Sequence, residues 1–467
     1  MEVLIKNLGT LKQAKFTLGD LTVICGCNNT GKTYATYALF GFLYAWREMF
    51  SIEINSSKVD QLLMDGVIHL DVQEYAKQSE QMIANGCQAY TKQLSRIFAA
   101  PTDRFKESEF RVRLDVQDIE NICVRSSYER QISAAKTDIF LITKPQESSE
   151  LIVTLLAEKE KIKIPPNILR EIISDALKDV LFSHLIPKPF IASAERTGAA
   201  IFCKELNFAR NRLLEEMSQA GKKVNPINPM ELLFKVYQDY ALPVEKNVDF
   251  TRQLESIVKK NSFIAEEYPD LLEDFADIIG GEYMVTRNDE LYYVPKGKRI
   301  KLSMDESSSA VRSLLDIGFY LRHEAERGDL LMIDEPELNL HPENQRRVAR
   351  LFARLINLGI KVFMTTHSDY IVKELNTLIM LNHDKPYLKE IIKNEGYRRE
   401  ELISVEKIKV YIAEEASITL EGKKRRAKYH TLTPADIDPE LGIEARSFDT
   451  TIETMNRIQE AIVWGKE

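Results

Sequence analysis

One glycine-rich segment carries residues whose types and spacing could do chemistry. Residues 26–33 read Gly-Cys-Asn-Asn-Thr-Gly-Lys-Thr and fit the pattern G-x-x-x-x-G-K-[ST]. The glycines let the backbone wrap closely enough for successive N–H groups to point at one phosphate chain. Lys32 would hold the β- and γ-phosphates of a nucleotide, and Thr33 would bind magnesium. The segment therefore predicts a phosphate-binding loop.

The elements on either side of this loop support the interpretation. Residues 21–25 form an apolar, strand-like run directly before it, and a helix is predicted to begin near Lys32. The positive end of that helix dipole would favour phosphate. The alternative is a glycine-rich turn that matches the pattern by chance. A strand directly before the segment and a helix directly after it make this alternative less probable. The residues predicted to contact the nucleotide here are Gly26, Asn28, Asn29, Thr30, Gly31, Lys32 and Thr33.

A second apolar strand, predicted over residues 330–335, ends in two acids, Asp334 and Glu335. This is the layout of a Walker B strand, which is buried in a parallel sheet and has its carboxyl end at the site. Asp334 would bind magnesium, directly or through water, and Glu335 would polarise the attacking water. Many strands end in acids, so the signal gains its weight from the loop at residues 26–33.

A third strand, predicted over residues 361–366, would deliver His367 to the same edge of the sheet. Before it, an amphipathic helix with one apolar face is predicted to end at Gly359. His367 could sense the γ-phosphate or steady the attacking water. A structural histidine is the alternative, but the position one βαβ unit after Asp334 favours the functional role.

The long spacing between the two halves of this site is informative. Lys32 and Asp334 are about 300 positions apart, far more than one βαβ crossover requires. The spacing argues against a small GTPase or a nucleotide kinase and for a large ATPase whose head is assembled from both ends of the chain. The predicted fold class is α/β, a P-loop NTPase with a mixed and parallel sheet flanked by helices, plus helical insertions.

Composition sets further bounds. The 467 residues are 44% hydrophobic and 29% charged, as expected of a globular protein of two or three domains. The net charge of −8 does not favour constitutive binding of nucleic acid by the whole surface. Five scattered cysteines, no signal-peptide layout and no apolar run long enough to span a bilayer predict a cytoplasmic protein without membrane attachment.

Between the two halves of the site, the pattern predicts several insertions. Residues 62–99 are predicted as helical, residues 110–116 as a half-buried strand, and residues 139–143 and 151–156 as strands of an antiparallel layer. A helix over 168–185, a buried strand over 189–193, a hairpin over 283–294 and a strand over 407–413 are also predicted. The predicted divisions are 1–61, N-terminal part of the head; 62–188, insertion; 189–201, strand and loop; 202–281, helical arm or lid; 282–385, C-terminal part of the head; 386–467, hairpin and helix extension.

Taken together, these residues resemble the ABC-type ATPase head of the SMC/RecF superfamily, especially the OLD-like AAA family ATPases of bacterial antiphage defence. The loop at 26–33, the block Ile-Asp-Glu-Pro-Glu-Leu-Asn-Leu-His-Pro at 333–342 and Thr-Thr-His-Ser at 365–368 carry the resemblance. Looser matches are Ala-Glu-Arg-Thr-Gly at 194–198, in the place of a Q-loop, and residues 304–310, in the place of the signature motif.

The resemblance implies ATP and Mg²⁺ as cofactors and a homodimer or higher homo-oligomer in which two heads sandwich the nucleotide. Ser307, Ser308 and Ser309 would touch the γ-phosphate of the other copy, and Arg196 would contact nucleotide. The sequence departs from the usual pattern because the signature glycines are absent, with Ala310 near where one is expected. A plain helix cap is the alternative for these serines, and slow or partner-dependent hydrolysis is expected.

The function that the resemblance implies is a sensor or regulatory ATPase that controls a separate nuclease or toxin effector in antiphage defence, as in Septu, PARIS and retron-associated systems. Two alternatives stay open: a RecF-like repair ATPase acting directly on DNA, and an assembly scaffold with negligible turnover. Lys423 to Arg426 form a basic run that could meet DNA phosphates or be a solvated turn. About 85 residues after Leu381 lack an acidic catalytic cluster, so nuclease activity is expected elsewhere.

Overall fold

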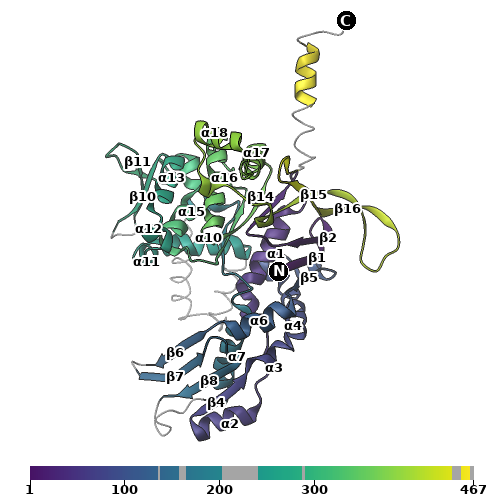
Figure 1. The fold of residues 1–467 in the computed structure, drawn as a ribbon, viewed down its shortest axis with the longest axis vertical. Helices are drawn as coiled ribbons and strands as arrows, with labels where there is room; N and C mark the ends of the chain where they lie inside the picture. The colour runs from purple at the N-terminus through teal and green to yellow at the C-terminus, as the bar shows by residue number, and fades with distance from the viewer. Residues whose placement is uncertain (135–136, 157–164, 202–239, 287–289, 444–453, 463–467) are drawn as a thin grey trace, which may run out of the picture. The chain divides into compact units, whose positions relative to one another are not determined.

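The computed structural model describes residues 1–134, 137–156, 165–201, 240–286, 290–443 and 454–462 (Figure 1). The chain forms two compact units. The first comprises Met1–Leu4, Phe42–Gln93 and Glu109–Lys188, and the second comprises Ile5–Gly41, Leu94–Ser108 and Pro189–Glu467. Strand β1 (Glu2–Leu8) and helix α1 (Lys32–Met49) have residues in both units.

A six-stranded sheet in the order β16-β15-β3-β14-β13-β9 forms the centre of the second unit. Five of its strands run parallel, and β16 pairs antiparallel with β15 at one edge. Every residue of β3 and β13 is buried, as apolar runs in a covered parallel sheet should be. The predicted α/β fold with a mixed and parallel sheet is therefore confirmed. The strands are β3 (Leu21–Cys25), β9 (Pro189–Ala192), β13 (Leu330–Asp334), β14 (Lys361–Thr366), β15 (Ile408–Thr419) and β16 (Arg426–Pro434).

Helices cover this sheet through their apolar faces. In α16, the side chains of Val348, Leu351, Phe352 and Leu355 lie in the core, and the helix follows β13 as the 3.6-residue period predicts. Helix α17 begins at Asp369 with Ser368 as its cap and packs beside α16. The labelled α-helices that lie wholly in the described part of this unit are α5 (Leu94–Ile97), α10 (Leu242–Arg252), α11 (Leu254–Ile257), α12 (Phe263–Glu267), α13 (Pro269–Ile279), α14 (Ser309–Ser313), α15 (Leu315–Phe319), α16 (Pro342–Asn357), α17 (Asp369–Met380) and α18 (Pro386–Asn394).

The segment expected to form a helical arm divides between described and undescribed residues. Residues 202–239 lie outside the described part of the chain. In the described part, Leu254, Leu271 and Phe275 from α11 and α13 belong to the same hydrophobic core as Ile333 of β13. Residues 242–279 therefore pack as part of the head.

A small antiparallel sheet follows these helices. The hairpin predicted over 283–294 is present as β10 (Gly281–Val285) and β11 (Leu291–Pro295), with Tyr283 opposite Tyr293. Strand β12 (Leu302–Ser303) extends it on the β11 side, so that the order is β10-β11-β12. Strand β10 is thus an edge strand of this sheet.

The C-terminal segment enters the central sheet, which the sequence did not indicate. The strand predicted over 407–413 is the first half of β15, which pairs parallel with β3 from Ile408 to Ile412. The basic run Lys423 to Arg426 lies at the tip of the β15–β16 hairpin, where all four side chains are exposed. Short strands β17 (Ile437–Asp438) and β18 (Gly442–Ile443) follow, and a helix covers residues 454–462.

The first unit contains a four-stranded antiparallel sheet in the order β4-β8-β7-β6, as predicted for its two central strands. Its helix α7 confirms the helix predicted over 168–185, and Phe42, Phe50 and Phe182 pack edge to face or tilted in its core. The elements are α2 (Ser56–Asp65), β4 (Val67–Asp71), α3 (Val72–Ala76), α4 (Ser79–Thr91), β5 (Glu109–Arg113), α6 (Val116–Arg125), β6 (Tyr128–Ala134), β7 (Thr137–Lys144), β8 (Glu150–Leu155) and α7 (Pro166–Phe182).

Two predictions for this unit were wrong in detail. The helical prediction over 62–99 passed over β4, which Gly66 separates from α2 by adopting the left-handed conformation at the helix end. The strand predicted over 110–116 ends at Arg113, because Asp115 caps α6 by accepting a hydrogen bond from the Gln117 amide. A cap residue beside an apolar run decided the local structure in this second case.

Candidate active site

The register of the central sheet brings the three predicted motifs to one edge. Strand β14 lies between β3 and β13, with Thr366 opposite Cys25 and Thr365 opposite Asp334. All three strands are parallel, so their carboxyl ends face the same side, where ligands bind in such sheets. The loop after β3, the acids after β13 and His367 after β14 therefore meet there.

The loop after β3 depends on two glycines. Gly26 has φ 136° and Gly31 has φ 98°, a region that side chains rarely adopt. A Cβ atom at Gly26 would lie 2.5 Å from the main-chain oxygen of Ala413 in β15, so the neighbouring strand also excludes a side chain. Asn29 has φ 63° and, like Asn28, is exposed at the tip of the loop, while the Thr30 hydroxyl donates to the Cys27 oxygen at 2.8 Å.

Lys32 begins α1 and turns its side chain back into the loop. Its Nζ donates to the main-chain oxygens of Gly26 and Cys27, each at 2.8 Å, and the residue is 6% exposed. Burial lowers the pKa of Lys32, whereas the carboxylates of Glu335 and Asp334 raise it. Lys32 is thus held in the field of the acids at the end of β13, as the two-part site requires.

Asp334 combines deep burial with one free oxygen. Its Oδ1 accepts a hydrogen bond from the Thr365 hydroxyl, while its Oδ2 is buried and has no partner within the described ranges. Burial raises the pKa of Asp334, and the hydroxyls of Thr365 and Thr33 lower it. A buried carboxylate oxygen without a partner, beside the Thr33 hydroxyl, fits Mg²⁺, which prefers oxygen ligands. Asp334 and Thr33 are the residues that would hold the ion.

Glu335 occupies an unusual backbone conformation at the strand end. Its φ is 54°, a left-handed value that is uncommon for residues other than glycine, and its amide donates to the Thr365 oxygen at 3.1 Å. The side chain is 26% exposed. Strained backbone of this kind clusters at functional sites, and here it turns the Glu335 carboxylate out of the sheet edge while Asp334 stays inside.

Glu337 is a third carboxylate, to which the sequence analysis assigned no role. It is 7% exposed and accepts hydrogen bonds from the Thr366 hydroxyl at 2.9 Å and from the His367 amide at 2.7 Å. Burial raises its pKa, and these donors lower it. The sequence Asp-Glu-Pro-Glu could have indicated this role, because an acid two residues after Glu335 lies in the same turn.

His367 lies between two of these carboxylates. Its Nδ1 is 3.4 Å from Oε1 of Glu337 and 3.6 Å from Oε1 of Glu335, and its side chain is 41% exposed. Because the Glu337 carboxylate also accepts from the His367 amide, the position of the histidine is fixed from both its backbone and its ring. The imidazole can therefore reach a group that Glu335 also reaches.

Arg196 is placed differently from its predicted contact with nucleotide. The side chain is 1% exposed and donates to four main-chain oxygens: Ser313 at 2.6 Å, Asp334 at 2.7 Å, Ser193 at 2.8 Å and Glu335 at 2.8 Å. Such burial leaves no path from the guanidinium to a nucleotide. Instead, Arg196 supports the turn that carries the acids from inside the head. A polar cluster at a strand end predicted a role for this residue, but could not show on which side of the chain it acts.

The three predicted signature serines differ in their surroundings. Ser308 caps α14, with its hydroxyl accepting from the Val311 amide at 3.3 Å, and Ser309 begins the helix, both exposed. Ser307 is 6% exposed and donates to the Ser303 oxygen at 2.7 Å. Arg312 holds the segment by donating to the Ser307 oxygen at 2.6 Å. Ser308 and Ser309 are therefore free to meet another molecule, whereas Ser307 is engaged within its own loop.

The sequence profile of the AAA ATPase domain family matches residues 1–372. A search of curated proteins found no match. Within the described ranges, no helix is both long and apolar enough to cross a bilayer.

Three solved structures cover nearly the whole chain at low similarity. The SMC head bound to the C-terminal winged-helix domain of ScpA shows 11% identity and a TM-score of 0.32, covering 92% of this chain and 97% of that one. The Pyrococcus furiosus SMC head with an extended coiled coil, bound to the C-terminal domain of ScpA, shows 13% identity and a TM-score of 0.30. The match covers 98% of this chain and 98% of that one. The Thermotoga maritima SMC head domain shows 9% identity and a TM-score of 0.31, and the match covers 93% of this chain and 98% of that one. The family match spans the loop at 26–33, the acids after β13 and His367, and by that match this chain belongs to the AAA ATPase domain family.

Proposed function

We propose that this protein hydrolyses ATP with Glu335 as the residue that activates water. The main support for this proposal is that Lys32, the unpartnered oxygen of Asp334 and the Glu335–His367 pair lie together at one edge of the sheet. Phosphate oxygens would replace the loop carbonyls as acceptors for Nζ of Lys32. Bound Mg²⁺ would neutralise charge that develops on the transferred phosphoryl group.

The proton path follows from the surroundings of Glu335. A water that attacks the γ-phosphate loses its proton to the Glu335 carboxylate, which is partly exposed and faces the strand end. His367 lies within 3.6 Å of that carboxylate and orients the same water or the phosphate. Glu337 keeps the imidazole in place through its hydrogen bonds to Thr366 and His367.

Release of phosphate from ATP by the purified protein tests this assignment. Glu335→Gln is expected to lower kcat by roughly 10²–10⁴-fold, the usual contribution of general base catalysis, with little change in ATP affinity. Lys32→Ala should instead abolish nucleotide binding. Glu343→Gln, an exposed acid at the start of α16, is the matched control and should leave turnover unchanged. Turnover that persists undiminished in both Lys32→Ala and Glu335→Gln would reject the assignment.

We further propose that the active unit is a homo-oligomer in which Ser308 and Ser309 of one copy approach the γ-phosphate bound to another. Their exposure at the start of α14 supports this role. ATP should therefore shift the Glu335→Gln variant to a larger species in light scattering. Ser309→Arg should prevent that shift, while nucleotide binding by the separate copies persists.

The biological role that we propose is regulation of a separate nuclease or toxin in antiphage defence, in which ATP binding closes the head pair and hydrolysis reopens it. The OLD-like sequence resemblance supports this role. Phage challenge of cells carrying the gene with its neighbouring reading frames, compared with Lys32→Ala, is the test. Protection that does not require Lys32 would favour the scaffold with negligible turnover.

Direct action on DNA is the second candidate, and one observation favours it. Lys423, Lys424, Arg425 and Arg426 are all exposed at the tip of the β15–β16 hairpin. If they contact phosphates, duplex DNA should stimulate hydrolysis, with an affinity that falls steeply as salt rises. Replacing the four by glutamine should remove that stimulation and leave basal turnover unchanged. If duplex DNA leaves the turnover of ATP unchanged, this second candidate function is excluded.

A further inference from the structure

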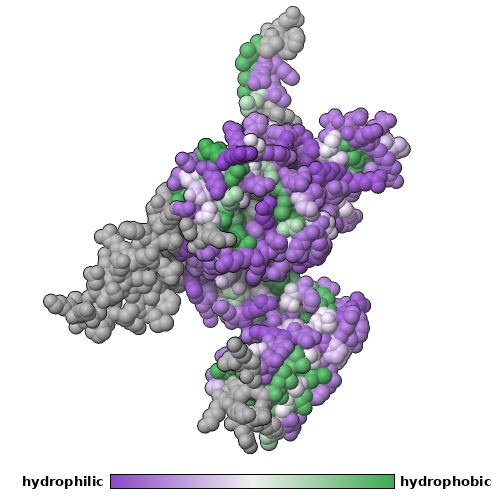
Figure 2. All heavy atoms as spheres, turned by 90° about the vertical axis from the view of Figure 1, so that its left-hand side faces the viewer, coloured by the Kyte–Doolittle hydropathy of each residue, from purple (hydrophilic) through white to green (hydrophobic). Residues whose placement is uncertain are grey.

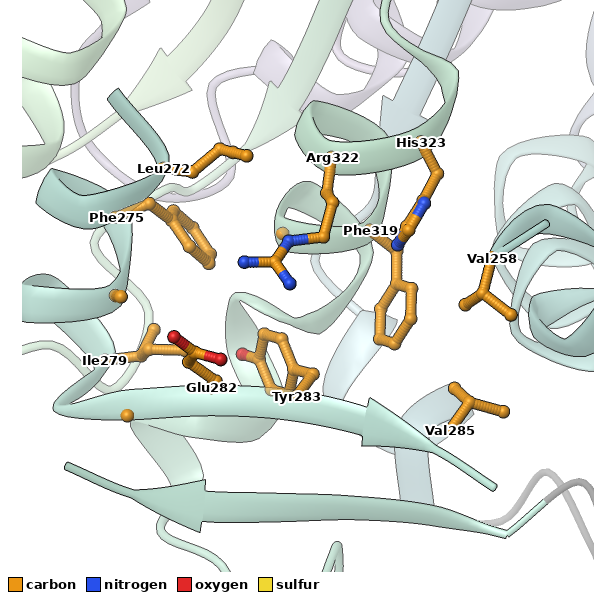
Figure 3. Close-up of a pocket in the computed structure, with 13 residues that line it drawn as sticks. Val258, Leu272, Phe275, Ile279, Glu282, Tyr283, Val285, Phe319, Arg322 and His323 are labelled. Carbon is orange, nitrogen blue, oxygen red and sulfur yellow. The ribbon is translucent and has the colours of Figure 1, made fainter. Parts of the chain in front are cut away.

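A cavity in the second unit lies apart from the candidate active site. It has a volume of about 200 Å³ and walls from α13, β10, α15 and the π-helical turn Tyr320–Glu324. Figure 3 shows Phe275, Tyr283 and Phe319 around it, with the Arg322 guanidinium reaching between them. None of the residues predicted to bind nucleotide lines it.

A wider groove adjoins this cavity along β10. Its volume is about 790 Å³, and its lining includes the consecutive residues Gly281 to Met284 together with Arg322. Because the lining includes both faces of β10, the groove reaches the backbone of this strand. It also includes Val294 and Pro295 of β11, opposite Glu282 and Gly281, so the groove covers this end of the β10–β11 pair as well. Figure 2, which views the left-hand side of Figure 1, shows hydrophobic residues within a hollow that hydrophilic residues surround.

The backbone of β10 presents unused hydrogen-bonding groups at this edge. The amide of Lys296 donates to the Gly280 oxygen and that of Thr286 to the Glu290 oxygen, both at 2.9 Å. Hydrogen-bonded pairs alternate along an antiparallel ladder, so the groups of Glu282 and Met284 face β11. Those of Gly281, Tyr283 and Val285 point to the free edge, and no hydrogen bond to them occurs within the described part of the chain.

Arg322 is one of the charged residues that line this groove, together with Glu273, Asp277, Glu282, Lys296 and Lys298. Lys296 pairs with Asp277. The Arg322 guanidinium is partly buried and has no hydrogen bond or ion pair with any residue that the structure describes. The neighbouring acid, Glu282, is exposed on the same wall and does not pair with it. A half-buried, unpaired arginine beside aromatic rings favours a carboxylate, which it can bind through two parallel hydrogen bonds.

We propose that an extended segment of a partner protein adds to β10 as a further strand, placing one aromatic or large aliphatic side chain in the cavity and a carboxylate against Arg322. Only another extended chain matches unpaired backbone groups that repeat every second residue, about 6.8 Å apart. The cavity is smaller than the roughly 300–1,000 Å³ of small-molecule pockets, but suits one anchoring side chain. This docking does not depend on the proposed hydrolysis.

Peptides of defined sequence test the proposal. The probes are fluorescein-labelled nonapeptides of alternating threonine and valine, with a central phenylalanine and an aspartate two residues before or after it. Fluorescence anisotropy with the full-length protein is expected to show saturable binding by one of the two. Alanine in place of the phenylalanine, or lysine in place of the aspartate, should each weaken binding at least about tenfold.

Two protein variants locate the site. Val285→Pro removes an outward-facing N–H without breaking the β10–β11 ladder, because edge strands tolerate proline there, and it should abolish binding. Val285→Thr keeps the N–H and should retain it. Arg322→Gln should remove the preference for aspartate over lysine. Hydrogen exchange of the wild type offers a readout that needs no variant, since the bound peptide should protect the amides of Tyr283 and Val285.

Three outcomes would overturn the proposal. The first is the absence of binding by every peptide up to about 1 mM, a concentration that corresponds to only about −4 kcal/mol of affinity. The second is binding without new protection of the Tyr283 and Val285 amides, which would place the peptide elsewhere. The third is a homodimer that Val285→Pro, but not Val285→Thr, converts to a monomer, because a second copy would then occupy the edge.

Discussion

The Nη2 atom of Arg196 donates to the main-chain oxygen of Glu335 at 2.8 Å, from a side chain that is almost wholly buried. The same guanidinium binds the oxygen of Ser313, at the end of α14. One side chain therefore connects the strained turn that holds the proposed base to the short helix that begins at Ser309. A movement of that helix would therefore be transmitted to Glu335 through the rigid guanidinium group of Arg196.

Replacing Arg196 should damage turnover more than nucleotide affinity. Arg196→Lys keeps a positive charge but cannot reach four carbonyls in a plane, and each oxygen left unpaired costs about 1–3 kcal/mol. We expect kcat to fall at least about tenfold with KM for ATP changed less than about threefold. Thermal unfolding in parallel separates loss of fold from loss of positioning. A fall of kcat at a temperature where the variant is still folded would show that Arg196 serves the turn, whereas an unchanged kcat would contradict that role.

Asp334→Asn should stabilise the protein without metal and remove the effect of metal. Burial raises the pKa of Asp334, so stability from this group is complete below its ordinary pKa and is lost as pH rises through the folded value. The amide avoids that loss and still accepts from Thr365. For the wild type, Mg·ATP at a hundred times its Kd should add about 2.7 kcal/mol to the unfolding free energy. Calorimetry at pH 7.5 should show a much smaller gain for Asp334→Asn.

A second buried acid gives a pH dependence of stability. Burial raises the pKa of Asp316 to about 7, Arg196 and Thr251 lower it, and its Oδ2 has no partner in the described structure. Because the folded pKa exceeds the ordinary value, the stability that this group provides is full below about pH 4, declines as pH rises through the folded value of about 7, and is lost above it. The Tm should fall between about pH 4 and pH 7, and Asp316→Asn should flatten that fall. An identical pH profile for both proteins would contradict the assignment.

Cysteine labelling should report occupancy of the loop. Cys27 is exposed within it, whereas Cys25 is buried, and burial raises the pKa of its thiol to about 12. Iodoacetamide at pH 7.5 should therefore modify Cys27 and spare Cys25, since the thiolate is the reactive form. Mg·ATP should slow that modification at least about tenfold. Peptide mass spectrometry gives the rate for each thiol, and Lys32→Ala should remove the protection.

Sequence alone predicted the strands of the candidate site closely. The five residues expected as the strand before the loop are β3, and the run ending in Asp334 is β13, because buried parallel strands have unbroken apolar sequences. The positions of the loop glycines could also be predicted, because this loop needs backbone conformations that residues with a side chain rarely adopt.

The missed features depend on contacts between residues distant in sequence. Nothing local distinguishes an arginine that supports a turn from one that reaches a ligand, so Arg196 was assigned to nucleotide. Glu337 acquires its role from hydrogen bonds to Thr366 and His367, which lie on another strand. The alternation in β15 predicted a strand, but not that its neighbour would be β3, about 390 positions earlier.

The position of β3 in the sheet has a consequence for the synthesis of the protein. Both of its neighbours, β14 and β15, are made in the last quarter of the chain. At roughly 5–20 residues per second, β3 waits about 20–70 s with both edges unpaired before β14 leaves the ribosome. Exposed apolar strand edges promote aggregation during such delays. Yield of folded protein should therefore depend on chaperone supply and on slow growth far more than the stability of the finished head would suggest.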